Sequence, residues 1–529
     1  MRNHRWILFT SLIVLGAAGG YLLVRTADVT PDAAKTTAAL PPSPHNYDSL
    51  PPTFHSGQRG PGKSHGDVEA IAKGALAGQR TIHFKDRASM AAFLENIKGK
   101  GIAVMGRLDK LNTLHIGFLD KDELAGLLDG SEKNGFVFPM QVPDLPEGSI
   151  QPGAVPLGNH LADYLNVSQY DRTEWGKNVS VAVLDTGVSL SASFAKQMSQ
   201  TTLVDLPADL STLNGHGTAV ASLILQVAPD AQIISIRIAD DQGQSNSSLI
   251  AQGILAAADS GAQLINISLG GFGDSQVLRD AVAYAQSKGI VIVSSAGNNG
   301  VNQITQPASL PGVVAVGGVD AKSDILLFSN SGPNLAATAP GYGVAAEGVT
   351  GGYVSFSGTS ASSPIEAGVI AAAMSNNVIG SLTAAEANAL VSASLDEAGA
   401  PGVDPSYGGG TVDLGRVMQS KTVGIVDAAV ASEWVATTDS GQVLQVTVQN
   451  RGTAPIFNVP VTVTTSAGVQ TFYAGSLLAN QTQTFEVPIT VNPTGSTTFQ
   501  SSIGVPTGQN DVRPGNNSRK DVYTPASAQ

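Results

Sequence analysis

The stretch Val-Ser-Val-Ala-Val-Leu-Asp-Thr-Gly, residues 179–187, joins a short apolar run to a carboxylate and a glycine turn. Similar apolar runs occur at residues 233–238, 264–267 and 290–293, and segments of helical periodicity separate them. Apolar strands that alternate with helices are typical of a parallel sheet covered by helices on both faces. We therefore predict an α/β domain over residues 150–420, with any active site beyond the carboxyl ends of its strands.

The regions on either side of this domain have different patterns. Residues 67–149 follow the order strand, helix, strand, strand, helix, strand, which predicts a ferredoxin-like α+β unit. Residues 421–529 alternate apolar and polar side chains with a period of two, which predicts an all-β sandwich. Residues 26–66 are rich in proline and small residues and predict an extended linker.

The N-terminal residues 1–25 predict export. Arg2 and Arg5 precede an uncharged apolar run of 19 residues, 6–24. That length exceeds the apolar core of a cleavable signal peptide, roughly 7 to 15 residues, and suffices to span a bilayer, which takes about 17 to 25. We expect a signal anchor that leaves the bulk of the chain outside the cytoplasm. A removed signal peptide, which is the alternative, would make the protein secreted.

Charge and cysteine content exclude several classes of function. The net charge of −13 gives no electrostatic attraction to nucleic acid, so we predict no nucleic-acid partner. The chain has no cysteine, which excludes disulfides, thiolate metal sites and a cysteine nucleophile. A covalent nucleophile would have to be another residue.

Three motifs of the α/β domain carry groups suited to nucleophilic catalysis. Asp185 ends the first strand, His216 lies in Asn-Gly-His-Gly-Thr, and Ser360 lies in Ser-Gly-Thr-Ser-Ala at the start of an apolar helix. A serine hydroxyl needs a base, and the base needs a carboxylate that holds its tautomer, so we predict a triad of these residues. Asn298, which follows the strand at 290–293, is the predicted oxyanion donor together with the Ser360 backbone N–H.

Any one of these motifs alone is more often an ordinary turn. Their order along the chain, Asp then His then Ser, is the order of subtilisin, and residues 150–420 resemble the subtilisin-like serine proteases, or subtilases. The resemblance includes Ser-Leu-Gly-Gly at residues 268–271. It implies that substrate adds as a strand to a cleft lined by Ser268, Leu269, Gly270 and Gly297.

The resemblance also suggests roles for the flanking units. Residues 67–149 resemble the subtilase propeptide, a chaperone and inhibitor, which implies processing near residues 145–155; a mere accessory domain is the alternative. Residues 421–529 are similar to the CARDB sandwich of bacterial cell-adhesion proteins. A stabilising or spacing domain without a ligand is an equally open interpretation of that sandwich.

The sequence departs from the subtilase pattern close to the predicted site. Ala361 replaces the usual methionine, Ile365-Glu366 replaces His-Val, and Ala219 replaces a histidine. None of these positions carries a group of the predicted triad, so no catalytic group is lost. Residues 220–229 lack the loop that binds calcium in many subtilases. We predict no cofactor and no metal site, although Asp240 and Asp241 leave a calcium site elsewhere open.

Together these observations predict an exported serine endopeptidase, made as a proenzyme. Its expected partners are protein or peptide substrates, its own propeptide as inhibitor, and the membrane through its N-terminal anchor. The alternative is a catalytically silent surface protein that uses the protease fold and the sandwich for adhesion.

Overall fold

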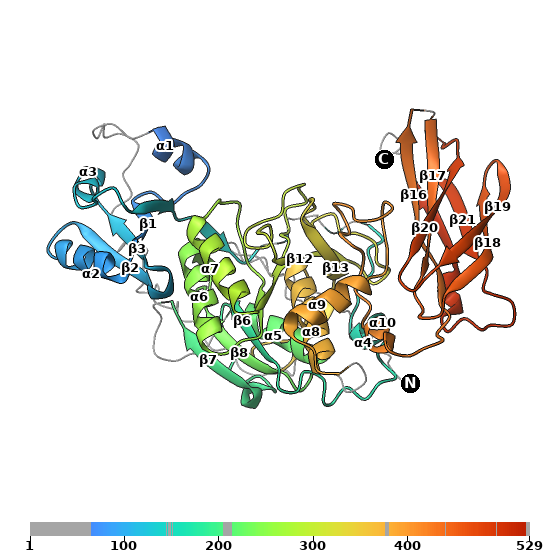
Figure 1. Cartoon of the computed structure of the whole chain (residues 1–529), viewed down its shortest axis with the longest axis horizontal. Helices are drawn as coiled ribbons and strands as arrows, with labels where there is room; N and C mark the ends of the chain where they lie inside the picture. Colours follow the sequence, from blue (N-terminus) through green and yellow to red (C-terminus); the bar gives the residue numbers. More distant parts are fainter. Residues whose placement is uncertain are drawn as a thin grey trace, which may run out of the picture.

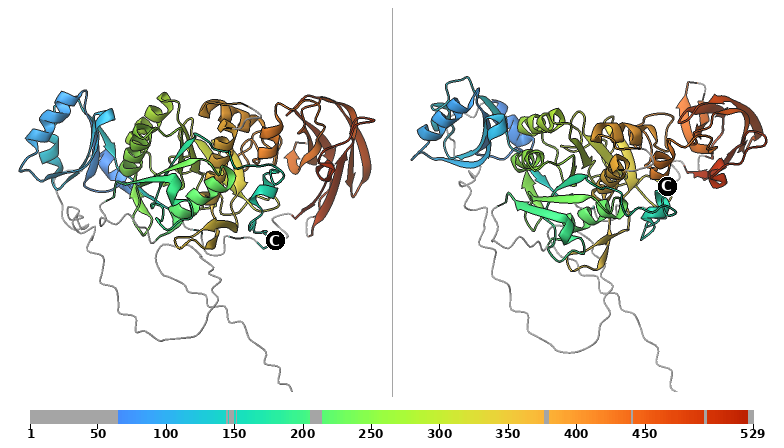
Figure 2. Two further views of the ribbon diagram at one scale, coloured as in Figure 1. Left: turned by 90° about the horizontal axis from the view of Figure 1, so that it is seen from below. Right: turned by 60° about the horizontal axis from the view of Figure 1, so that its bottom comes forward.

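The computed structural model describes residues 65–143, 145, 150, 152–204, 214–375, 380–439, 441–492 and 495–524. Three units lie side by side along the longest axis (Figure 1), and they keep this order in the other views (Figure 2). We name them the N-terminal unit (residues 65–143), the central domain (152–420) and the sandwich (425–524). The predicted anchor and nearly all of the predicted linker lie outside the described residues. Within the described part of the chain, no helix has the length and apolar character needed to cross a membrane.

A parallel sheet of seven strands forms the middle of the central domain, in the order β13-β12-β11-β10-β6-β8-β7. The prediction of an α/β fold with a parallel sheet is confirmed. The strands are β6 (Ser180–Asp185), β7 (Met198–Thr202), β8 (Gln232–Arg237), β10 (Leu264–Ile267), β11 (Val291–Ser295), β12 (Val314–Val319) and β13 (Leu335–Pro340).

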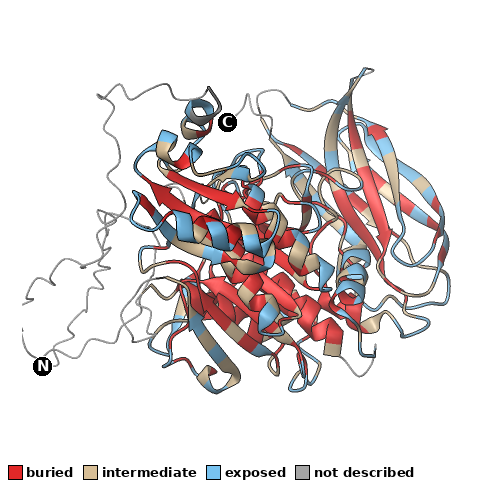
Figure 3. Cartoon of the chain, turned by 60° about the vertical axis from the view of Figure 1, so that its left-hand side comes forward, coloured by how far each residue is buried: buried red, intermediate tan, exposed pale blue. Residues whose placement is uncertain are grey.

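Helices cover both faces of this sheet because both faces of its strands are apolar. Along β6, Val181 and Val183 pack in one core with α5 and α8, whereas Ala182 and Leu184 pack in a second core with α6 and α7. Buried residues are concentrated in these layers (Figure 3). The remaining elements of the domain are α4 (Leu161–Tyr164), η3 (Ala195–Gln197), α5 (His216–Val227), β9 (Gln244–Asn246), α6 (Ser247–Asp259), α7 (Gln276–Ser287), β14 (Val344–Glu347), β15 (Tyr353–Phe356), α8 (Thr359–Ser375), α9 (Ala384–Ala393) and α10 (Leu414–Gln419).

The N-terminal unit has an antiparallel sheet in the order β2-β3-β1-β4, with the predicted ferredoxin-like succession of strands and helices. Its core is formed by one face of the sheet and the helices α2 and α3. The elements are α1 (His65–Ala72), β1 (Gln79–His83), α2 (Arg87–Asn96), β2 (Ile102–Leu108), η2 (Asp109–Leu111), β3 (Thr113–Phe118), α3 (Lys121–Ala125) and β4 (Lys133–Phe136). A short strand, β5 (Pro139–Gln141), then leaves this unit and enters the central domain.

The sandwich consists of two antiparallel sheets, ordered β16-β17-β20 and β19-β18-β21-β22. Alternate apolar residues of both sheets form its own core, as the period-two pattern predicts. Its elements are β16 (Ala428–Thr438), β17 (Gly441–Asn450), β18 (Ile456–Thr465), β19 (Gly468–Leu477), β20 (Thr482–Pro488), β21 (Thr497–Ile503), η4 (Pro514–Asn517) and β22 (Ser518–Tyr523).

Candidate active site

The end of β6 and the start of α5 bring two of the predicted triad residues together. Asp185 is the last residue of β6, and His216 is the first residue of α5. His216 Nδ1 lies 2.7 Å from Asp185 Oδ1, and both side chains are almost fully buried. A carboxylate at Nδ1 favours the tautomer in which Nε2 carries no hydrogen and can accept a proton.

Glycine at position 217 allows this close approach. A Cβ atom on Gly217 would overlap the carbonyl oxygen of Gly187 and would lie 3.2 Å from the Cβ of Asp185. The Gly217 N–H donates to Thr186 Oγ1 at 3.2 Å, and the Thr186 N–H donates to Asp185 Oδ1 at 2.7 Å. The first turn of α5 is therefore fixed against the turn that follows β6.

Ser360 lies in the first turn of α8, where its side chain is fully buried. Its Oγ donates to the carbonyl oxygen of Ser268 at 3.1 Å, and Ser268 Oγ donates to the carbonyl oxygen of Ser360 at 3.2 Å. The helices that carry His216 and Ser360 pack in the same core. The structure thus places the predicted nucleophile beside the segment predicted to bind substrate.

Asn298 follows β11, and its side-chain amide has a fixed orientation. Its Oδ1 accepts hydrogen bonds from the Thr359 N–H at 2.9 Å and from Thr359 Oγ1 at 2.8 Å. A backbone N–H can only donate, so the atom facing it must be the amide oxygen. The amide nitrogen consequently points the other way, where Nδ2 donates to the carbonyl oxygen of Pro143 at 3.2 Å.

The chain's own residues 139–142 occupy a groove between two edges of the central domain. On one side β5 pairs antiparallel with β9, and the Val142 N–H donates to the carbonyl oxygen of Gly243 at 2.9 Å. On the other side Gln141 and Gly270 exchange N–H to carbonyl hydrogen bonds of 3.0 and 2.9 Å. The segment is therefore hydrogen-bonded along both of its edges.

The side chains of this segment alternate in the manner of a strand. Phe138, Met140 and Val142 are buried in the core that also contains Leu269, whereas Pro139 and Gln141 are exposed. Extended peptides that add to a sheet gain affinity from the backbone and specificity from such alternate side chains.

The residues predicted to bind substrate do not all contact this strand in the same way. Gly270 pairs with it, Leu269 packs in the same core, and Ser268 contacts Ser360 instead. The Gly297 N–H donates to Thr359 Oγ1 at 3.2 Å, which supports the turn that carries Asn298. The opposite wall, β9 with Gly243, was not predicted; the glycine-containing loop after β8 was the available signal.

Glu366, one of the departures noted in the sequence, is buried within α8. Burial raises the pKa of its carboxyl to about 8. Among the described residues, Oε2 of this side chain has no hydrogen-bond partner. Near neutral pH the side chain is therefore protonated, and it adds no negative charge to the helix that carries Ser360.

Asp240 and Asp241, the acidic pair at which the sequence left a calcium site open, bind other groups of the protein. Asp240 Oδ1 accepts hydrogen bonds from the backbone N–H groups of Gln242 and Gln244, both at 2.9 Å. Asp241 forms an ion pair with Arg237. In the part of the chain that the structure describes, no group of three or more acidic or histidine side chains is placed to hold a metal ion.

Comparison with known proteins shows similarity to one protein family and to several bacterial proteases. Residues 176–410 match the subtilase family. A thermophilic serine proteinase of Bacillus sp. (strain AK1) is 37% identical over 225 residues, which is 40% of this chain and 55% of that protein. A thermostable alkaline protease of Halalkalibacterium halodurans is 34% identical over 266 residues, covering 48% of this chain and 72% of that protein. Subtilisin DY of Bacillus licheniformis is 36% identical over 236 residues, covering 42% and 85%.

Among solved structures, a lanthipeptide protease aligns with a TM-score of 0.45 at 26% identity, over 49% of this chain and 93% of that one. The parallel-sheet fold and the curated relatives define a serine peptidase. The chain belongs to the subtilase family, and it is a subtilisin-like serine endopeptidase that hydrolyses peptide bonds.

Proposed function

We propose that Asp185, His216 and Ser360 are the catalytic triad of this endopeptidase. His216 Nε2 takes the hydroxyl proton as Ser360 Oγ attacks the peptide carbonyl, and Asp185 stabilises the imidazolium that forms. The same proton then goes to the leaving amine, and water hydrolyses the acyl-enzyme in a second, mirrored step.

The observation that carries this proposal is the hydrogen bond between Asn298 and a peptide carbonyl. Asn298 Nδ2 donates to the carbonyl oxygen of Pro143, at the end of a strand held in the groove beside Ser360. An oxyanion donor has to reach the oxygen of the bond that is cut. The Ser360 backbone N–H, in the first turn of α8, is the second proposed donor.

The same contact bears on the role of the N-terminal unit. We propose that it is a propeptide whose last strand fills the substrate groove and inhibits the enzyme until it is released. The carbonyl at the oxyanion donor belongs to Pro143, which supports processing between Pro143 and Asp144. This bond lies just before the window of residues 145–155 that the sequence suggested.

The proposed substrates are extended segments of proteins or peptides. A substrate would replace the strand at 139–142 and would make the same backbone hydrogen bonds to Gly270 and Gly243. Because Met140 and Val142 are buried in the groove, apolar side chains at these alternate positions should be preferred.

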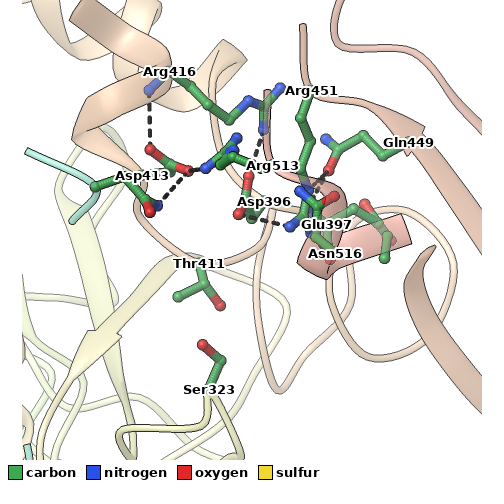
Figure 4. A network of polar contacts seen from close by, with 12 residues as sticks. Ser323, Asp396, Glu397, Thr411, Asp413, Arg416, Gln449, Arg451, Arg513 and Asn516 are labelled. Carbon is green, nitrogen blue, oxygen red and sulfur yellow. Dashed lines mark hydrogen bonds and ion pairs between the residues drawn. The ribbon is translucent and has the colours of Figure 1, made fainter. Parts of the chain in front are cut away.

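We further propose that the sandwich is a permanent support of the central domain rather than an adhesion module. Figure 4 shows charged side chains of both gathered at their boundary. Arg513 of the sandwich forms ion pairs with Asp413 and, at 2.5 Å, with Asp427. Arg451, also of the sandwich, forms an ion pair with Asp396 at 2.9 Å.

Further polar contacts cross the same boundary. Arg416 of the central domain binds Asp396 at 2.9 Å and Asn480 of the sandwich at 2.7 Å. Gln449 Nε2 donates to the carbonyl oxygen of Leu395 at 3.0 Å. Burial alone would raise the pKa of Asp396, but the guanidinium groups of Arg451 and Arg416 hold that pKa below its ordinary value.

The boundary between the central domain and the sandwich depends on charged partners from both sides. A buried ion pair adds little net stability over apolar packing, but removal of one partner leaves an uncompensated charge and costs roughly 3 to 5 kcal/mol. Separation of the two domains would leave Asp413 and Asp396 without the arginines of the sandwich. A free-standing central domain is therefore expected to be much less stable.

Export rests on the sequence, whose apolar N-terminal run supports a signal anchor at residues 1–25. We propose that the proenzyme is held at the membrane by this segment and that processing after Pro143 releases the enzyme outside the cytoplasm. N-terminal sequencing of the unprocessed Ser360→Ala protein distinguishes an anchor from a removed signal peptide, because this variant should keep the residues ahead of Pro143.

A fluorophosphonate probe tests the triad. The wild type should react once its groove is free, whereas Ser360→Ala should not react, because only a serine activated by a base is labelled. Labelling of Ser360→Ala would assign the nucleophile to another residue, and a wild type that stays unlabelled after its propeptide is removed would favour the silent adhesion protein.

A further inference from the structure

Arg237 is among the largest fully buried side chains of the described residues, and it lies behind the triad. It is the last residue of β8 and pairs in register with Asp185, the last residue of β6. Its guanidinium forms an ion pair with Asp241 at 2.9 Å, and its Nε donates to the carbonyl oxygen of Ala239 at 3.3 Å. A buried guanidinium is costly, so its retention here calls for a reason beyond packing.

The aliphatic part of Arg237 supports the turn after Asp185. A Cβ atom on Gly187 would lie 3.1 Å from Arg237 Cδ, which shows how closely the side chain packs under the turn. The carbonyl of Gly187 lies in turn against Gly217, the residue after His216. Arg237 thus backs the surface on which the catalytic pair is assembled.

The guanidinium of Arg237 is also connected to His216 through hydrogen bonds of Asp241 and Asn214. The backbone carbonyl of Asp241, the ion-pair partner, accepts a hydrogen bond from Asn214 Nδ2 at 3.0 Å. Asn214 Oδ1 accepts the backbone N–H of His216 at 3.1 Å. A chain of contacts therefore runs from Arg237 through Asp241 and Asn214 to the start of α5.

The same loop also forms one wall of the substrate groove. Asp241 lies in the connection between β8 and β9, and Gly243 in that connection binds the backbone of Val142. The ion pair between Arg237 and Asp241 consequently fixes a loop that contacts both the segment of the catalytic base and the strand in the substrate groove.

We propose that Arg237 is a positioning residue that, through Asp241 and Asn214, fixes His216 and the β9 wall of the groove relative to each other. This inference rests on the proposed triad. Because one loop contacts both the substrate strand and the segment that carries the base, loss of the guanidinium should let the two shift relative to each other. Misplacement of reacting groups by about 1 Å can cost on the order of 100-fold in rate.

The test compares Arg237→Met, which keeps most of the aliphatic stem, with Arg237→Lys and with Asn214→Ala. A matched control is Arg172→Met, because Arg172 Nη1 binds the Gln226 carbonyl near the other end of α5 at 2.6 Å. Active enzyme is counted by fluorophosphonate titration, so that kcat is given per competent site and a folding defect is separated from a slow enzyme.

We expect kcat per titrated site to fall roughly 10- to 100-fold in Arg237→Met and less in Asn214→Ala. The two changes should be non-additive when combined, because they interrupt one chain of contacts. Arg237→Lys should restore part of kcat, and Arg172→Met should leave kcat per site unchanged.

Unchanged kcat per site in Arg237→Met would overturn the positioning role, even if the variant is less stable. Additive effects of Arg237→Met and Asn214→Ala would do the same. These outcomes differ from a failure of the triad itself, in which wild type would not be titrated or Ser360→Ala would keep its activity.

Discussion

The central domain contacts its two neighbours through different chemistry. On the N-terminal side, backbone hydrogen bonds of Gly270 and Gly243 and buried apolar side chains hold one extended strand. Any suitable extended peptide can offer the same groups. On the C-terminal side, the guanidinium of Arg513 forms an ion pair with the buried carboxylate of Asp413. The first boundary suits a part that leaves and is replaced by substrate, and the second suits a part that stays.

The largest expected effect comes from breaking the C-terminal boundary. Arg513→Ala should lower the free energy of unfolding by roughly 3 to 5 kcal/mol, because Asp413 and Asp427 would remain buried without their cation. Urea unfolding measures the change, with Lys520→Ala, an exposed position on β22, as the control. A value within about 0.5 kcal/mol of wild type would mean that the sandwich is loosely attached.

Removal of Asn298, the proposed oxyanion donor, tests the contact with the N-terminal unit. Asn298→Ala should reduce kcat by about 100- to 1,000-fold with little change in KM, because the donor acts mainly in the transition state. Steady-state kinetics on the processed enzyme provide the measurement. Since Asn298 also binds Thr359, circular dichroism must show that the variant keeps its fold. A kcat close to that of wild type would remove Asn298 from the mechanism.

The buried side chain of Met140 in β5 should matter for inhibition and not for catalysis. Met140→Ala in the isolated propeptide, added in trans to processed enzyme, should weaken inhibition by roughly 2 kcal/mol, or about 30-fold, because a fully buried side chain is lost. Gln141→Ala changes an exposed side chain and leaves the backbone pairing in place, so it should inhibit like wild type. Equal inhibition constants for Met140→Ala and wild type would argue against the groove as the inhibited site.

The smallest effect, taken over a single pH unit, comes from Glu366 in the core of the central domain. Because burial raises the pKa of Glu366 from 4.5 to about 8, the folded chain keeps this proton over that range while the unfolded chain loses it. Stability from this group is therefore full below the lower value and falls by about 1.4 kcal/mol per pH unit as the pH rises toward the higher one. Glu366→Gln should remove this slope, as measured by urea unfolding across the same range.

Glu95→Gln, which changes an exposed glutamate of α2, is the control for that series and should leave the pH dependence of unfolding as it is. If Glu366→Gln and wild type lose stability in parallel as the pH rises, Glu366 is ionised in the folded protein and has a partner that compensates its charge.

Local patterns account for what the sequence could predict. Asp185 was identified because an apolar strand stops at a carboxylate, and Ser360 because a glycine turn meets an apolar helix. Both signals lie within a few residues, and the chemistry of serine, histidine and aspartate then predicts the three roles. The sheet was predictable for the same reason, since apolar runs such as residues 264–267 are local as well.

Contacts between distant segments account for what the sequence could not predict. Arg513 pairs with Asp413 across 100 positions, and Asn298 reaches Pro143 across 155. Arg237 lies within the predicted strand at residues 233–238. Nothing in that strand indicates that its side chain is linked through other residues to Asn214 and His216. A local pattern carries no information on which charged residues meet, so these contacts appear only once the sheet has brought its connections together.

The N-terminus of the mature enzyme tests the central claim most directly. Wild type and Ser360→Ala are expressed in the same host, and each purified protein is analysed by N-terminal sequencing and intact mass. The triad acting on the strand in its own groove predicts a wild-type chain that begins at Asp144 and a Ser360→Ala chain that retains the N-terminal unit. The same mature terminus in both proteins would contradict self-processing, and a wild-type terminus far from Asp144 would contradict the assignment of Pro143 to the oxyanion donor.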